Sequence, residues 1–382
     1  MSFPLELFIL EAEKQGKSKE YIDVCTEYIK KLDSKGLPVI FSLHHLAQEI
    51  GVQYKYLRFL IGENDKKYEH KYKKYNYFTI KKKRGGYREI MAPAKDLKYI
   101  QKWILLNILY AYQLENCCKG FMPNQGILNN ATVHENSEKI LKIDLLKFYD
   151  SITFDRVVQV FESIGYIKNL AISIAKILTA SNRESYWNGF DEYSKYKLSS
   201  IRSAKTPVLP QGAPTSPMLA NIIASNLDKK IIILSKKLNF CYSRYADDLT
   251  FSIKDSTGVL PYPKLIEKII ESEGFFVNPS KTIIKRKGQR QYVTGLTVTN
   301  NVNLSKKYRK EIFKHLYYCR KFGVNSHLKR NKKFTKYNIV QFHDWLFGHI
   351  CYTNSINKEA ANKMFDIFRK INWSIDEKIN PS

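Results

Sequence analysis

The stretch Cys-Tyr-Ser-Arg-Tyr-Ala-Asp-Asp-Leu-Thr-Phe-Ser-Ile, residues 241–253, carries the strongest signal for the fold. The segments on either side of Asp247 and Asp248 predict a strand, a tight turn that carries both carboxylates, and a second strand. Asp favours turns, so the pair has a purely structural interpretation. It also has a metal-binding interpretation, because hard cations such as Mg²⁺ bind carboxylate oxygens and keep positions open for substrate phosphates.

A third acid, Asp144, ends the predicted strand 139–144, roughly 100 residues before the pair. Acids from separate strands can converge on two metal ions that lie about 3.5–4 Å apart. In such sites one ion lowers the pKa of an attacking hydroxyl and the other stabilises the leaving oxygen of a phosphoryl transfer. A strand-ending acid is common on its own, but its combination with Asp247 and Asp248 favours this chemistry.

The composition points to a polyanionic partner. The chain has 382 residues, with 63 Lys and Arg against 36 Asp and Glu, which gives a net charge of +27. Its 26 Tyr and 21 Phe offer faces on which unpaired bases stack, while the basic side chains follow phosphates. With 44% hydrophobic residues the chain can bury a large core, and its length suggests two or three structural units.

The six cysteines show no C-x-x-C spacing, which is typical of a reduced, cytoplasmic protein with ordinary thiols. The N-terminus lacks a basic region before an apolar stretch, so we expect no secretory signal. No uncharged apolar run reaches the length of a membrane-spanning helix, so we expect no membrane partner.

The periodicity of apolar residues predicts helices at both ends of the chain. Four helices are expected within residues 1–62, with Ser42 as the N-cap of the third, and the chain is again helical and basic from about residue 306 to Trp373. Lys, Arg and Tyr alternate over residues 66–88, which favours a strand pair that tracks phosphates, with a solvated charged face as the alternative. The remaining predictions are helices over 153–180, a loop or mobile insertion at 181–205, one apolar-striped helix that follows the loop 210–217, and a strand over 289–298.

Three motifs occur in a characteristic order: Asp144-Leu-Leu-Lys-Phe-Tyr-Asp-Ser-Ile, Leu209-Pro-Gln-Gly-Ala-Pro-Thr-Ser-Pro and Tyr245-Ala-Asp-Asp. This series resembles the palm motifs of reverse transcriptases. Residues 274–281 look like the motif that follows in that family, and residues 81–93 resemble the fingers motif of its bacterial members.

Two shorter stretches indicate which group of reverse transcriptases the sequence resembles. Asn130-Ala-Thr-Val-His134 and Val293-Thr294-Gly295 are similar to marks of bacterial retron reverse transcriptases. A helix start and a turn would explain them structurally. Their places before the first catalytic Asp and near the start of the thumb favour retron membership.

The resemblance assigns roles by position. The metal ligands would be Asp144, Asp247, Asp248 and the backbone carbonyl of Leu145. Lys281 would protonate the leaving pyrophosphate. The nucleotide would be bound by Arg88 and Lys82 at the triphosphate, by Gln211 in the pocket, and by Tyr149, whose ring would exclude a 2′-hydroxyl. The cognate RNA would be held by Asn130, His134, Val293, Thr294 and Gly295.

The implied fold is α+β, a right-hand polymerase with fingers, a palm built on an antiparallel sheet, and a helical thumb. We expect a helical N-terminal extension at residues 1–62, fingers and palm at 63–295, and the thumb at 296–382.

The implied function is RNA-directed DNA polymerisation by a nucleotidyltransferase that uses two Mg²⁺ or Mn²⁺ ions. A structured noncoding RNA would serve as primer and template. Synthesis from dNTPs would begin at a 2′-hydroxyl of an internal guanosine and yield branched RNA–DNA, or msDNA. The resemblance also implies antiviral defence beside an effector protein, and the N-terminal helices could contact RNA, an effector or a second copy of the chain.

Two alternatives remain. One is a group II intron-like or abortive-infection reverse transcriptase, although an intron enzyme would usually carry further regions after the thumb, and this sequence stops at Ser382. The other is a non-catalytic RNA-binding scaffold, which the charge suits equally well. The three acids and Gln211 argue against a scaffold, because RNA binding alone needs none of them.

Overall fold

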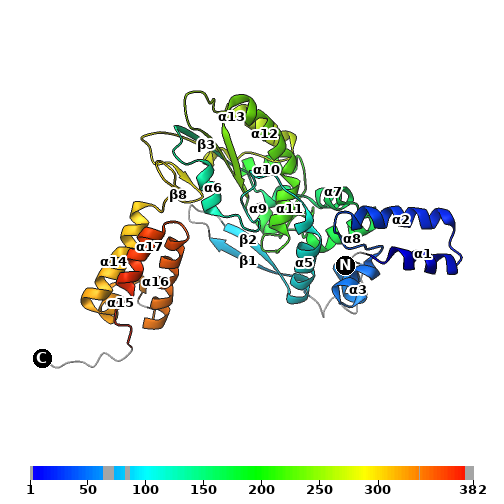
Figure 1. Ribbon diagram of the computed structural model, residues 1–382, viewed down its shortest axis with the longest axis horizontal. Coiled ribbons are helices and arrows are strands. Elements are labelled where there is room, and N and C mark those ends of the chain that lie inside the picture. The colour runs from blue at the N-terminus through cyan, green and yellow to red at the C-terminus, as the bar shows by residue number, and fades with distance from the viewer. Residues whose placement is uncertain (1–2, 63–72, 82–86, 335, 375–382) are drawn as a thin grey trace.

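The computed structural model describes residues 3–62, 73–81, 87–334 and 336–374. The predicted residue Lys82 and most of the basic stretch 66–74 lie outside these ranges. Figure 1 shows a central sheet, a group of N-terminal helices on one side and a separate helical bundle on the other. Within the described ranges, no helix combines the length and apolarity needed to cross a membrane.

The central sheet is the predicted antiparallel palm. Its strands lie in the order β4-β5-β3-β6, and every neighbouring pair is antiparallel. The strands are β3 (Lys139–Asp144), β4 (Cys241–Tyr245), β5 (Asp248–Ile253) and β6 (Ile283–Arg286). The hairpin predicted around Asp247 is therefore β4–β5, with Asp247 in the turn and Asp248 as the first residue of β5.

The two faces of this sheet differ because successive side chains of a strand point to opposite sides. Leu141, Ile143, Leu249 and Phe251 belong to the main core, together with residues of α12 (Ser225–Leu238) and α13 (Pro263–Ser272). The opposite face carries the acids. α12 and α13 therefore cover one face of the palm, and the acids lie on the other.

The single helix predicted after the loop 210–217 is two helices. α11 (Ser216–Ile223) ends at Ile223, α12 begins at Ser225, and Ala224 between them has a ψ of −1°, away from the typical helical value. The predicted stripe persists across this break, since Leu219, Leu227 and Ile231 are fully buried. A break of one residue leaves apolar periodicity nearly unchanged, which explains why the sequence pattern missed it.

The fingers and the N-terminal helices share the main core with the palm, with buried members such as Leu46, Leu57, Ile100 and Ile174. The predicted Ser42 cap is present, because its hydroxyl accepts a hydrogen bond from the backbone of His45. The N-terminal helices are α1 (Leu5–Lys14), α2 (Lys19–Asp33), α3 (Leu43–Ile50) and α4 (Tyr54–Leu60). The fingers and adjoining elements are β1 (Tyr75–Lys81), β2 (Tyr87–Pro93), α5 (Lys95–Asn107), η2 (Leu109–Ala111), α6 (Ile127–Val133), η3 (Tyr149–Ser151), α7 (Phe154–Ile164) and α8 (Lys168–Leu178).

The prediction of a loop at residues 181–205 is wrong. The segment contains α9 (Glu184–Asn188) and α10 (Glu192–Ser199), and Asp191 caps α10 by accepting a hydrogen bond from the Ser194 backbone at 2.8 Å. Phe190 and Leu198 are buried in a small cluster with residues of the palm. The polar composition of this segment favours a loop. Its packing against the palm nevertheless stabilises two short helices, because tertiary contacts outweigh local propensity.

The single strand predicted over residues 289–298 is also wrong. It is a hairpin of β7 (Tyr292–Val293) and β8 (Leu296–Thr297), and the turn between them is formed by Thr294 and Gly295. Both turn residues have positive φ, 46° and 86° respectively. Gly295 suits this conformation because it has no Cβ.

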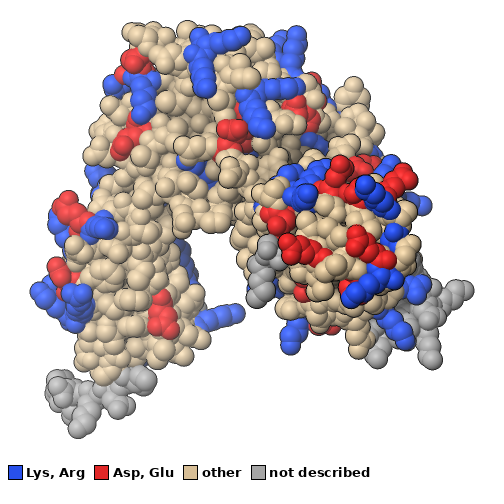
Figure 2. Space-filling model, turned by 45° about the vertical axis from the view of Figure 1, so that its right-hand side comes forward, with Lys and Arg blue, Asp and Glu red and all other residues tan. Residues whose placement is uncertain are grey.

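The thumb is a helical bundle with its own core, formed by residues such as Leu316, Phe342, Leu346 and Met364. Its elements are α14 (Lys306–Phe322), α15 (Val324–Arg330), η5 (Lys332–Phe334), α16 (Ile339–Asn354) and α17 (Lys358–Phe368). Figure 2 shows an arch in which a groove separates the thumb lobe from the lobe that holds the N-terminal helices. The arch agrees with the predicted right hand, whereas the predicted domain limits stay predictions.

Candidate active site

The three predicted acids meet at one end of the palm sheet. Asp144 and Asp248 are register partners in the antiparallel pair β3–β5. The backbone N–H of Leu145 donates a hydrogen bond of 2.8 Å to the carbonyl of Asp247. Carboxylates from residues roughly 100 positions apart in the sequence therefore lie close together at one end of the sheet, on the face opposite α12 and α13.

The carboxylates repel one another in a partly buried place. Burial raises the pKa of Asp247 to about 6, and the negative charge of Asp144 contributes further. Burial also raises the pKa of Asp248, although the neighbouring Lys142 opposes that change. Such a cluster favours the arrival of positive charge.

Two lysines supply positive charge within the protein. Lys281 of η4 (Pro279–Lys281) places Nζ 2.8 Å from Oδ1 and 3.0 Å from Oδ2 of Asp144, and Asn278 donates to the same Oδ1 at 3.2 Å. Lys142 donates to Oδ2 of Asp248 at 2.7 Å. Lys281 thus contacts Asp144, and its catalytic role stays a prediction.

The donor set suits a hard divalent cation, because oxygen ligands with net negative charge are what Mg²⁺ prefers. No group of three or more Asp, Glu, His or Cys side chains in the described residues is gathered around a common point for a metal ion. Oxygens of Asp144 and Asp248 face lysines instead. A cation bound between Asp144 and Asp247 would relieve the repulsion that raises the pKa of Asp247.

A buried ion pair supports the acidic hairpin from below. Arg244, one residue before Tyr245, donates to both carboxylate oxygens of Asp228 at 2.9 and 2.6 Å, and neither side chain is more than 1% exposed. Arg244 also donates to the side chain of Asn221 and to the carbonyl of Ala246 in the hairpin turn. This network fixes the turn that presents Asp247.

A neighbouring chain segment closes against the same turn. The backbone of Lys119 donates to the carbonyl of Arg244 at 2.8 Å. A Cβ added to Gly120 would lie only 2.7 Å from the backbone nitrogen of Ala246. Only glycine fits at this position without displacing the turn.

Of the predicted nucleotide-pocket residues, Tyr149 lies near Asp247, while Arg88 lies on β2 and Gln211 lies against it. Tyr149 is half-buried, and its hydroxyl pKa is raised first by burial and then by Asp247, with Arg88 among the groups that oppose the shift. Arg88 is exposed on β2. The carbonyl of Gln211 accepts a 2.7 Å hydrogen bond from the backbone of Met91 on the same strand. The structure therefore joins the Tyr149, Arg88 and Gln211 regions.

Asn130 and His134 occupy a different environment from the one the sequence suggests. His134 is fully buried, and its ring nitrogens lie 2.7 Å from the hydroxyls of Ser252 and Ser243. Ser243 also donates to Asn130 at 2.7 Å. Burial lowers the pKa of His134 to about 3, so the ring is neutral. These side chains hold α6 against the palm and have no surface with which to contact RNA directly.

The second retron-like stretch packs against the first. Val293 is buried with Ala131 in a small cluster that also contains residues of β3 and β8. The Thr294 hydroxyl donates to the carbonyl of Ile127 at 3.1 Å, and Gly295 is exposed. The two short motifs are therefore one structural unit, and its exposed part is the β7–β8 turn. Their role in RNA binding stays a prediction.

The sequence pattern did not reveal four polar side chains that contact the acids or support the hairpin, namely Lys142, Asp228, Arg244 and Asn278. Arg244 carried a usable signal, since it lies on the same face of β4 as Tyr242, which belongs to the apolar core. A charge at such a position demands a buried partner. The identity of that partner, Asp228, depends on how α12 packs.

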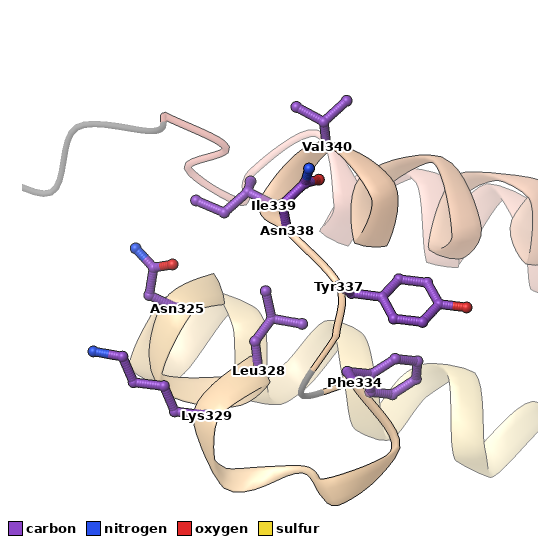
Figure 3. A pocket seen from close by; sticks show the side chains of 8 residues that line it. All are labelled: Asn325, Leu328, Lys329, Phe334, Tyr337, Asn338, Ile339 and Val340. Atoms are coloured by element: carbon purple, nitrogen blue, oxygen red, sulfur yellow. The ribbon is translucent and has the colours of Figure 1, made fainter.

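A hollow of about 700 Å³ lies in the thumb between α15 and the start of α16 (Figure 3). It contains none of the predicted site residues. The residues that line it are Asn325, Leu328, Lys329, Phe334, Tyr337, Asn338, Ile339 and Val340.

Comparison with known proteins identifies the family to which this sequence is similar. The family described as reverse transcriptase (RNA-dependent DNA polymerase) matches residues 80–314. The chain is 33% identical to the retron Ec86 reverse transcriptase of Escherichia coli, over 82% of this chain and 88% of that protein. It is 31% identical to the retron Mx65 reverse transcriptase of Myxococcus xanthus, over 86% of this chain and 71% of that protein.

A third relative is longer. The retron Mx162 reverse transcriptase of Myxococcus xanthus is 33% identical over 69% of this chain, and the match spans 55% of its own length. Among solved structures, telomerase from Candida tropicalis in complex with a TWJ fragment of telomeric RNA aligns over 84% of this chain and 59% of that chain. The TM-score of that alignment is 0.41 and the sequence identity is 14%.

Proposed function

This chain belongs to the bacterial retron reverse transcriptases, which are RNA-directed DNA polymerases, and we propose that it uses a cognate structured noncoding RNA as both primer and template. Synthesis begins at a 2′-hydroxyl of an internal guanosine in that RNA. The product is branched RNA–DNA, or msDNA.

One observation carries this proposal further than any other. Asp144, Asp247 and Asp248 converge at the end of the palm sheet, and Tyr149 lies close enough to Asp247 for its hydroxyl pKa to respond. A scaffold that only binds RNA has no use for three mutually repelling, partly buried carboxylates, since their repulsion costs stability. The cluster therefore supports catalysis over the scaffold alternative.

The acids are the proposed holders of two divalent ions, Mg²⁺ or Mn²⁺, with help from the carbonyl of Leu145. Bound ions of this kind neutralise charge on the transferring phosphoryl group and activate the attacking hydroxyl. Lys281 sits against Asp144, where its ammonium can donate a proton to the pyrophosphate as it leaves.

The remaining pocket residues orient the nucleotide. Arg88 and Lys82 grip the triphosphate of the incoming dNTP through charge-assisted hydrogen bonds. Gln211 lines the pocket, and the half-buried ring of Tyr149 excludes a ribose 2′-hydroxyl. Selection of deoxynucleotides is thereby a steric property of one side chain.

The net charge of +27 supports a large RNA partner. Because Asn130 and His134 are buried, we assign their RNA role to the surface they position, which includes the turn formed by Thr294 and the exposed Gly295. We further propose antiviral defence with an effector protein, in the cytoplasm, where the six free cysteines stay reduced. The N-terminal helices are candidates for contact with the effector or with a second copy.

The double variant Asp247→Asn with Asp248→Asn tests the catalytic assignment. We expect it to keep RNA binding and lose DNA synthesis, because both carboxylate charges are gone while the side chains keep their size. Asp255→Asn is the matched control, since Asp255 is an exposed acid in the loop after β5. DNA synthesis at the normal rate by the double variant would refute the metal-site assignment.

A further inference from the structure

The α9–α10 segment touches the proposed nucleotide pocket through buried charges. Two acids stand next to predicted pocket residues in the sequence: Asp150 follows Tyr149, and Glu89 follows Arg88. Both acids are nearly inaccessible, with 2% and 1% exposure. Among the described residues, the side chains that hydrogen-bond or ion-pair with these two carboxylates belong to residues 181–202, the segment that contains α9 and α10 and lies close to β2 in Figure 1.

Asp150 is held by two groups of this segment. Nη2 of Arg202 lies 3.6 Å from its Oδ1, and the hydroxyl of Tyr186 donates to its Oδ2 at 3.4 Å. Arg202 is itself only 5% exposed and lies 4.7 Å from the ring centroid of Trp187. The turn that carries Tyr149 is thus held in place by the contacts of Asp150 with Arg202 and Tyr186.

Glu89 is held by the start of the same segment. Arg183 donates to it from both its backbone and its side chain, and Asn182 donates to Oε2 at 3.5 Å. Asn182 also accepts a 3.1 Å hydrogen bond from Nη2 of Arg202. One arginine therefore connects the acid beside Tyr149 to the acid beside Arg88.

Palm residues also contact the α9–α10 segment directly. Nζ of Lys147 lies 3.5 Å from the ring centroid of Phe190, and Phe190 is buried with Leu146. The hydroxyl of Tyr193 donates to the carbonyl of Val277 at 3.4 Å. The segment is consequently a fixed part of the pocket wall.

Stability alone explains this cluster poorly. Buried ion pairs often contribute little because desolvation offsets their attraction. Here Nε and Nη1 of Arg202 are buried with no hydrogen-bond partner among the described residues, which adds to the cost. A costly buried network that ends beside two substrate-binding residues is better explained by the geometry it imposes.

We infer that Arg202 is a positioning residue which, through Asp150 and Asn182, sets the separation of Tyr149 and Arg88 and so determines how well the pocket distinguishes dNTPs from rNTPs. The inference rests on the proposed function, because it assumes that this pocket binds the incoming nucleotide. Arg202 itself acts through its neighbours and touches no substrate.

Single-nucleotide incorporation on a primed RNA template tests the inference, with kcat and KM measured for a dNTP and the matching rNTP. Arg202→Lys keeps the charge but cannot reach both partners in the same fork geometry. We expect the ratio of dNTP to rNTP kcat/KM to fall about tenfold or more, since small misplacements of binding groups cost up to about a hundredfold. Tyr186→Phe removes one hydroxyl from Asp150 and should lower the ratio in the same direction by a smaller factor.

Lys197→Ala is the matched control. Lys197 pairs with Glu271 of α13 at 2.6 Å, so its loss removes another ion pair of the same segment without touching the cluster. It should leave the discrimination ratio unchanged. Thermal unfolding of each variant separates a displaced pocket from a partly unfolded protein, and Tyr186→Phe still tests the positioning role if Arg202→Lys folds poorly.

The outcomes are distinct. If the unmodified protein incorporates dNTPs but Tyr186→Phe and folded Arg202→Lys both keep the original ratio and KM, the positioning role is wrong while the proposed function stands. If the unmodified protein incorporates no dNTP on any primed RNA, the proposed function itself fails.

Discussion

The ammonium of Lys142 lies 2.7 Å from Oδ2 of Asp248, on the face of the palm sheet that carries the acids. Lys142 is two residues before Asp144 on β3, so alternation places both on that face. Both side chains of the pair are about one quarter exposed, at 26% each. Like Asp144, which pairs with Lys281, Asp248 therefore has a counter-charge within the protein, whereas Asp247 has no ion pair among the described residues.

Replacing Lys142 with Met should change the metal requirement. Loss of a positive charge beside Asp248 removes repulsion toward an arriving divalent ion, so the Mg²⁺ concentration for half-maximal activity should fall about threefold or more. The maximal rate should also fall, because Asp248 loses the group that orients it. Titration of DNA synthesis with Mg²⁺ measures both effects. Lys139→Met, on the same strand, is the control, and an unchanged Mg²⁺ requirement in Lys142→Met would count against the pairing.

Tyr149 should act as the gate against ribonucleotides. Tyr149→Ala opens the space beside the sugar, so the protein should incorporate rNTPs at least about tenfold more efficiently relative to dNTPs. Tyr149→Phe keeps the ring and should keep the selectivity. Incorporation assays with dNTPs and rNTPs distinguish the two variants. Equal selectivity in the unmodified protein, Tyr149→Ala and Tyr149→Phe would show that Tyr149 does not line the nucleotide pocket.

The acidic cluster predicts a pH dependence of stability in metal-free protein. The pKa of Asp247 is raised from 3.8 to about 6, so the folded state holds this proton more tightly than the unfolded chain. Its contribution is fully present below pH 3.8 and is lost as the pH rises through about 6. Relative to Asp247→Asn, the unmodified protein should therefore lose thermal stability between about pH 4 and about pH 7. Added Mg²⁺ should reverse that loss, and parallel pH profiles for the two proteins would exclude the raised pKa.

The buried pair beneath the hairpin predicts a large effect on stability. Asp228→Ala leaves Arg244 buried without its counter-ion, which typically costs about 3–5 kcal/mol of unfolding free energy. Asp366→Ala removes the acid of an exposed pair with Arg369 and should cost no more than about 1 kcal/mol. Urea denaturation measures both variants. Equal stabilities would show that the Asp228 pair does not support the hairpin.

Local patterns predicted the parts of this structure that depend on local physics. The β4–β5 hairpin, the strand that ends at Asp144 and the thumb helices all follow from alternation, turn residues or helical spacing. Tyr149 and Gln211 were assigned to the site from the spacing of family motifs, and their roles stay predictions.

Tertiary packing hid the rest. The α9–α10 segment is polar in composition, and its helices are stabilised by contacts with Leu146 and Asp150 that no local pattern shows. His134 is polar but is buried in a closed network with two serines, which the sequence does not reveal, and the RNA-binding role of its region stays a prediction. The countercharges Lys142 and Arg202 depend on strand register and on long-range pairing, which a single sequence does not display.

The most direct test is to identify the nucleic acid that copurifies with the protein. It shows whether the protein uses one particular RNA as both primer and template, starting from an internal 2′-hydroxyl. Purified protein should carry one predominant structured RNA, and incubation with dNTPs and Mg²⁺ should extend DNA from a 2′-hydroxyl within that RNA. Sequencing after debranching should show a single internal guanosine as the branch point. RNA of random sequence, or DNA extended only from 3′-ends, would contradict the proposed function.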